Sequence, residues 1–183
     1  MASSLQTKTF LLQELRNYPM SQYTETLIIQ QGISCEDLLA ASMDPHKQTA
    51  FRAAWLLEHI VLNEPSLLQG FYLKFLDYLP VQHNWSCIRS YSKLLMLATE
   101  RKSPIEHSEE QEEHIIEHSF RWLIAKDAPV ASVVNCMDIL YNLSSKHPWV
   151  KDELAAQIKF LLKTPTAALA GRGNRILKRI LNS

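Results

Sequence analysis

The order of hydrophobic and polar positions over residues 50–79 predicts two helices joined by a turn. Residues 51–62 are apolar on nearly all sides, so a helix there has to be covered from more than one direction. After a turn at Pro65, apolar residues recur in steps of three and one, which is typical of one face of an amphipathic helix. A single helix pair cannot bury this much apolar surface, and we expect further helices to stack on it. The stripe of the second helix comprises Leu68, Phe71, Tyr72, Phe75, Leu76 and Leu79.

The same pattern returns later in the chain, at an offset of 83 residues (139 − 56). Leu56 corresponds to Ile139 and Pro65 to Pro148. Both turns place proline at the start of the second helix, where its missing N–H group costs nothing. The offset equals about two units of roughly 40 residues, which is the period of repeats built from two helices. A middle unit then falls over residues 85–126, with a longer loop between its helices. The other equivalent pairs are Leu57 with Leu140, Ile60 with Leu143, Phe71 with Leu154, Phe75 with Ile158 and Leu79 with Leu162.

Shorter helices are expected ahead of the first pair. The apolar spacing predicts helices over residues 4–17 and 22–31, and Gly32 is a stop signal for the second of them. Ser34, followed three positions later by Asp37, predicts the capping box of another helix. Such departures from the repeat are expected at the end of a stack, because terminal elements seal its apolar surface.

Local start signals place the later helices. Asp44 and Pro45 predict the beginning of the first helix of the pair around residues 50–79, which we call the central pair. Asp would be its N-cap and Pro its first helical residue. Ser108 and Gln111 predict a second capping box. A break at residues 164–166 precedes a final helix rich in basic residues.

Over roughly residues 45–182 this arrangement resembles the HEAT and armadillo-like families of helical repeats. The resemblance implies an all-α fold, namely a right-handed α–α superhelix of stacked antiparallel helix pairs with about nine or ten helices. We expect a single domain over residues 1–183. Within it, residues 1–43 would form N-terminal capping helices and residues 44–182 the HEAT-like helix pairs.

Composition narrows the class of protein. Hydrophobic residues make up 46% of the chain and charged residues 21%, as in an ordinary globular domain. The formal net charge is +0, so the chain lacks the overall positive charge that marks many nucleic-acid-binding or membrane-binding proteins. Cys35, Cys87 and Cys136 cannot all pair internally and are expected to be reduced. Neither a signal peptide nor an apolar run of about 18 residues is apparent, and we expect a cytoplasmic protein.

One motif suggests metal chemistry. His114, Glu117 and His118 match the H-x-x-E-H pattern of inverted zinc peptidases, in which the two histidines share a helix face and the glutamate acts as a base. A catalytic zinc needs a third protein ligand, and the sequence offers only scattered acidic residues for that role. The alternative interpretation is that both histidines lie on the polar, solvated face of their helix.

A second motif suggests a lyase. Residues 42–47 resemble the signature loop of the fumarase and adenylosuccinate lyase superfamily, in which a serine is the catalytic base. Here Asp44 is inserted between Met43 and Pro45, and Gln48 stands where the family has Asn. A helix start with Asp before Pro accounts for the same residues without catalysis.

The final helix suggests an anion-binding patch, since Arg172, Arg175 and Arg179 follow helical spacing and share one side. HEAT-like DNA glycosylases also line a helical-repeat groove with basic and aromatic residues. The alternative is that cations simply suit a helix C-terminus.

Four tryptophans, Trp55, Trp85, Trp122 and Trp149, are expected to pack in the core or between helices.

We predict a non-enzymatic protein–protein interaction module, a scaffold or adaptor that uses no cofactor and no metal. The second helices of the pairs expose charges of both signs, which suits a protein or peptide partner better than nucleic acid. No membrane contact is expected, and homo-oligomerisation stays open. The alternatives are a lyase-like enzyme, a zinc hydrolase and a nucleic-acid-binding HEAT-like protein. The candidate binding residues are Lys74, Asp77, Glu110, His114, Glu117, Arg121, Arg172, Arg175 and Arg179, and the same surface includes Gln69, Asp152, Gln157 and Lys159.

Overall fold

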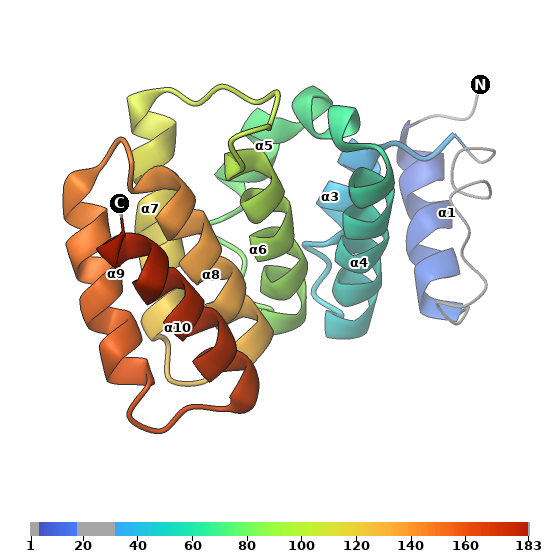
Figure 1. Ribbon diagram of the computed structural model, residues 1–183. Helices are drawn as coiled ribbons and strands as arrows, with labels where there is room; N and C mark the ends of the chain where they lie inside the picture. Colours follow the sequence, from blue (N-terminus) through green and yellow to red (C-terminus); the bar gives the residue numbers. More distant parts are fainter. Residues whose placement is uncertain (1–3, 18–31, 183) are drawn as a thin grey trace. The chain divides into compact units, whose positions relative to one another are not determined.

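A computed structural model describes residues 4–17 and 32–182, with side chains from residue 11 onward (Figure 1). Every regular element in these residues is a helix and none is a strand, which confirms the predicted all-α fold class. The chain divides into two compact units, residues 1–91 and 92–183, and each is described by itself. The single domain expected over the whole chain stays a prediction. The helix expected over residues 22–31 lies outside the described residues.

The first unit is built around α4 (Lys47–Asn63), which packs against α1 (Ser4–Asn17) and α3 (Cys35–Ala41). Its inward residues Ala53, Leu57 and Val61 are 0% exposed. The stripe predicted for the next helix is entirely buried, as the sequence indicated. The boundary between the units falls inside α6 (Trp85–Thr99), after Tyr91.

Two start signals in the first unit had different outcomes. Ser34 and Asp37 form the predicted capping box of α3. The start predicted at Asp44 and Pro45 is wrong, because α4 begins at Lys47 and the side chain of His46 is its N-cap. The Asp44 carboxylate instead accepts a hydrogen bond from the backbone N–H of His46, at 2.8 Å, and closes the turn that precedes the helix.

The second helix of the central pair is interrupted, in contrast to the continuous helix that the apolar stripe predicted. Pro65 opens a 3₁₀-helix, η2 (Pro65–Gly70), and α5 (Tyr72–Asp77) follows it. The break lies at Phe71, whose φ of −131° and ψ of 9° are not helical. Gly70 precedes the break, and glycine is a weak helix former because it loses more backbone entropy than any other residue.

The second unit contains α7 (Glu109–Ile124), α8 (Val130–Leu143), α9 (Pro148–Leu161) and α10 (Ala167–Leu181). Helix α8 packs against the other three, and α10 also packs against α9 (Figure 1). Helix α7 begins with the predicted capping box of Ser108 and Gln111, and Pro148 is the first residue of α9, as predicted.

Burial agrees with the repeat alignment at most of its inward positions, except that Leu79 is 1% exposed and its equivalent Leu162 is half-buried. Leu57 in α4 and its equivalent Leu140 in α8 are each 0% exposed. Phe75 and its equivalent Ile158 are also 0% exposed. The described helices include none that is long and apolar enough to cross a membrane.

Candidate functional site

The candidate residues on α7 lie mainly on its exposed side. Glu110, Glu117 and Arg121 are exposed, whereas His114 is half-buried. Arg121 Nη2 donates to Glu117 Oε1 at 3.2 Å, an ion pair between residues one turn apart. Exposed pairs of this kind contribute little to stability, so both side chains can be recruited by a partner at small cost.

The H-x-x-E-H motif does not place both histidines on the polar face, so that expectation is wrong for His118. Its side chain is buried, and its Nδ1 donates to the backbone carbonyl of His114 at 2.8 Å. Burial lowers the pKa of His118, although its hydrogen bond to the His114 carbonyl opposes the shift. Among the described residues, no group of three His, Cys, Asp or Glu side chains is arranged to hold a metal ion. The geometry therefore gives the zinc hydrolase no support.

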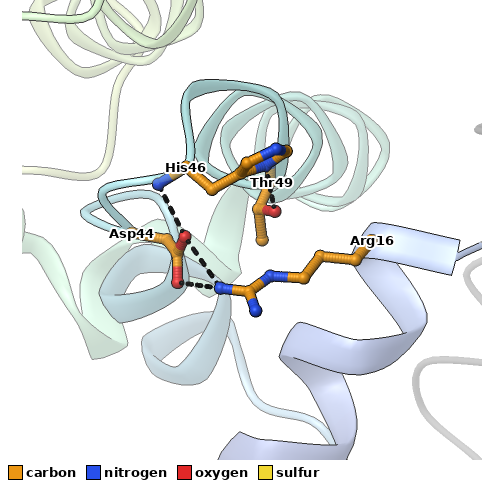
Figure 2. Close-up of polar contacts among 4 residues, drawn as sticks. All are labelled: Arg16, Asp44, His46 and Thr49. Carbon is orange, nitrogen blue, oxygen red and sulfur yellow. Dashed lines mark hydrogen bonds and ion pairs between the residues drawn. The ribbon is translucent and has the colours of Figure 1, made fainter.

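The lyase-like loop serves the packing of the first unit. The Ser42 hydroxyl is buried, donates to the Leu39 carbonyl at 2.6 Å and lies 2.5 Å from the Tyr91 hydroxyl. Figure 2 shows the rest of the loop, where Arg16 Nη2 lies 3.4 Å from both Asp44 oxygens and the His46 ring lies beside Thr49. A serine enclosed in this way has no access to a substrate. The contact between Arg16 and Asp44 instead gives the loop a structural role, since it joins α1 to the turn before α4.

Lys74 and Asp77 lie on α5 and are exposed. Lys74 Nζ donates to Glu36 Oε2 at 3.0 Å, and this hydrogen bond raises the pKa of the lysine. The two candidates share a short helix, but one of them is engaged with α3.

The arginines of α10 differ in their surroundings. Arg172 Nη1 lies 3.1 Å and 3.0 Å from the two oxygens of Asp138, a largely buried carboxylate on α8. Burial raises the pKa of Asp138, although Arg172 and Arg179 oppose the shift. The Arg179 guanidinium lies 5.7 Å from the centre of the Tyr141 ring. Two of the three arginines thus attach α10 to α8, while Arg175 is exposed.

The cysteines do not supply a nucleophile. Cys87 and Cys136 are buried, and burial raises the pKa of the Cys87 thiol to about 12 and that of Cys136 as well. Burial and the charge of Glu64 also raise the pKa of Cys35. All three thiols are free, and their raised pKa values disfavour the thiolate that nucleophilic chemistry needs.

The second unit exposes a surface that the sequence analysis missed. We call it the aromatic face: Phe120 and Ile124 on α7, with Trp149 and Phe160 on α9. Trp149 is 57% exposed and Phe160 63%. Of the two expected positions for the tryptophans, in the core or between helices, the core is therefore wrong for Trp149, and its packing is against a ring of another helix. The Phe120 and Trp149 rings stack with centroids 5.9 Å apart, and Ile124 lies one turn beyond Phe120. Lys163 Nζ lies 5.1 Å from the centre of the Phe160 ring.

The repeat offset itself contained the signal for this surface. Shifting Trp149 back by the same 83 residues gives Ser66, and shifting Phe160 gives Asp77. Both equivalents in the first unit are exposed. The alignment therefore places Trp149 and Phe160 at positions that face outward from the helix pair.

A second feature of this unit is a cavity of about 840 Å³, which we call the loop pocket. It is lined by the end of α6 and the segment that follows, by Glu112 in the first turn of α7, and by the end of α8 with the turn into α9. Its charged lining residues are Glu100, Arg101, His107, Glu112, Lys146 and Lys151.

Glu112 is a buried and paired charge of the loop pocket. Its side chain is 4% exposed, and its oxygens accept hydrogen bonds from Lys146 Nζ at 2.6 Å and His147 Nε2 at 2.8 Å. Burial alone would raise the pKa of Glu112, but the hydrogen bonds and charges of Lys146 and His147 leave it below the ordinary value of 4.5. The cluster joins α7 to the turn between α8 and α9.

The comparisons with known proteins agree with this architecture. A family model described as a HEAT repeat domain matches residues 8–180 and so spans both units. No curated protein and no solved structure matches the chain. The family match supports the stacked helix pairs that the offset predicted.

Proposed function

Because the chain belongs to the HEAT repeat domain family, we propose that it is a non-enzymatic protein-interaction module that binds a partner through the aromatic face. The observation that supports this most is the exposure of Trp149 and Phe160, on one helix of the second unit. They are eleven residues apart, so they lie on nearly the same side of α9.

The chemistry of the aromatic face suits a protein partner. Aromatic side chains are enriched among the residues that dominate protein interfaces, because they bury a large area at a small cost in conformational entropy. The exposed part of α9 also carries Asp152, Glu153 and Lys159, so charges of both signs surround the apolar residues. A mixed rim of this kind gives specificity and orientation to a protein complex.

The compartment and the type of module form part of the same proposal. A scaffold or adaptor needs a surface for binding and no reaction centre, and neither the Ser42 loop nor the H-x-x-E-H motif supplies such a centre. The three free thiols support a reducing compartment such as the cytoplasm.

The test is quantitative capture of partners from an extract of the protein's own cells. The bait variant is Trp149→Ser with Phe160→Asp, which gives the second unit the residues found at the equivalent positions of the first. The matched control is Leu73→Ala with Val81→Thr. It removes two exposed apolar residues from the first unit and replaces each with the residue at the equivalent position of the second.

We expect wild type and control to retain the same partners and the α9 variant to lose them, with all three baits equally folded by circular dichroism. Equal capture by the α9 variant would reject the aromatic face as the binding surface. Loss of the partners from the control bait alone would move the surface to the first unit.

A further inference from the structure

The loop pocket is large enough to hold a ligand. Its volume of about 840 Å³ lies within the range of roughly 300–1,000 Å³ that is usual for binding pockets. It is built from residues 98–107, Glu112 and residues 141–151, all within the second unit. The relative placement of the two units therefore does not affect it.

The negative charge of Glu112 is already neutralised inside the protein. Each of its two oxygens is held by a cation or by an imidazole nitrogen, at 2.6 Å and 2.8 Å. The carboxylate is also almost completely buried. It therefore contributes little repulsion to an anion that enters the loop pocket, and Lys146 and His147 are committed to it.

Two cations in the same lining are not committed. Arg101 and Lys151 line the loop pocket, and within the described residues neither side chain makes a hydrogen bond or an ion pair. The lining also contains one further negative charge, that of Glu100, whose side chain is exposed. After Glu112 is balanced by its own partners, the lining keeps more positive than negative charge.

The rest of the lining suits a peptide better than a compact inorganic anion. Tyr141, Asn142 and Ser145 provide neutral polar groups, and Ile105 and Pro148 provide apolar contacts. Pockets that bind extended ligands combine apolar walls with a few well-placed polar groups.

We propose that the loop pocket binds an acidic peptide segment of a partner protein, with Arg101 and Lys151 pairing with its Asp or Glu carboxylates. The inference rests on the proposed function but uses a different surface, since Trp149 and Phe160 are not part of the lining. The aromatic face contributes apolar contact area, and the loop pocket contributes selectivity for acidic sequence.

The test uses a fluorescein-labelled hexaglutamate peptide and fluorescence polarisation at low ionic strength, with the full chain as the binding protein. The key variant is Arg101→Gln with Lys151→Gln. The matched control is Lys126→Gln with Lys178→Gln, which removes two exposed positive charges from the second unit outside the lining. All proteins are compared for equal melting temperature before use.

We expect wild type to bind the peptide, with an affinity that falls as salt is added. The pocket variant should bind about tenfold more weakly or worse, because two charge-assisted hydrogen bonds are lost. The control variant should stay within about twofold of wild type, since its two charges are exposed and screened.

Three results would overturn the proposal. They are absence of binding to the wild type, an equal loss in both variants, and tighter binding of a DNA duplex that depends on Arg101 and Lys151. The Trp149→Ser, Phe160→Asp protein should still bind hexaglutamate, so failure of the aromatic face and failure of the loop pocket can be told apart.

Discussion

The helix pairs around Pro65 in the first unit and Pro148 in the second are alike on the inside and different on the outside. Leu57 and Leu140 occupy equivalent positions and both are 0% exposed. On the outward side, Ser66 of the first pair corresponds to Trp149 of the second. Inward positions are constrained by packing, whereas outward positions are free to change with function. The departure from the repeat is therefore the main support for the proposed binding surface of the second unit.

The two pairs also differ in the continuity of their second helix. Helix α9 is continuous over Pro148–Leu161, whereas the equivalent stretch is divided into η2 and α5. The residue before the break is Gly70, and its equivalent in α9 is Glu153. Glycine in a helix interior costs about 1 kcal/mol relative to good helix formers, so this one difference favours the interruption.

The largest effect is expected where the two pairs agree. Leu57→Ala and Leu140→Ala should each reduce the free energy of unfolding by about 2–5 kcal/mol, because each removes a fully buried side chain and leaves a cavity. Urea unfolding followed by circular dichroism measures both. Leu62→Ala, at a residue that is 38% exposed, is the control and should cost much less. A small loss at only one of the two leucines would show that the pairs are not equivalent.

The next effect concerns Glu112 on α7, which belongs to neither of the two helix pairs compared above. Glu112→Gln should lower the free energy of unfolding by about 1–3 kcal/mol at neutral pH, because the buried ion pair with Lys146 is lost and the hydrogen bond from His147 is weakened. The pKa of Glu112 is lowered by folding, so its contribution is fully present above 4.5 and is lost as the pH falls through the lowered pKa. Denaturant unfolding across the acid range should show wild type and variant converging. A difference that stays constant down to low pH would contradict this origin.

The sequence predicted what depends on periodicity and local capping. The stripes of α5 and α9, the Ser34 and Ser108 capping boxes and the position of Pro148 all follow from spacing within a few residues. The start of α4 could not be predicted in this way. An aspartate can either cap a helix or close a turn, and Asp44 closes a turn by accepting a hydrogen bond from the backbone N–H of His46.

The candidate site was harder to predict, because it depends on which helices meet. Glu112 looks like an ordinary charge of a first helical turn, and only tertiary contact with Lys146 and His147 makes it a buried cluster. The same holds for Arg172, which spacing alone assigned to a basic patch and which pairs with Asp138 on another helix. Exposure of Trp149 could have been predicted, since its equivalent Ser66 is a typical surface residue.

A smaller effect tests the packing of α10, with two glycines as a matched pair. Gly171→Ala should stabilise the protein by about 0.5–1 kcal/mol, because nothing lies within 4 Å of the added Cβ. At Gly173 the added Cβ would lie 3.0 Å from Ile158 Cγ2 and 3.4 Å from Leu162 Cδ2, and overpacking should cost about 1–3 kcal/mol. Thermal melts compare them directly. Equal stabilisation by both substitutions would show that α9 and α10 are not in close contact at Gly173.

Only a small change in stability is expected for the variant that matters most for the proposed function. Trp149→Ser with Phe160→Asp should change the free energy of unfolding by only about 0.5–1.5 kcal/mol, mostly through loss of the stacking between Trp149 and Phe120. More than half of each aromatic side chain already faces solvent, so little burial is lost. Urea unfolding gives this value, and Leu73→Ala with Val81→Thr is again the control. A loss as large as that of Leu140→Ala would mean that Trp149 and Phe160 hold the second unit together. Their exposure would then be a cost of folding, and the difference between the two helix pairs would no longer indicate a binding surface.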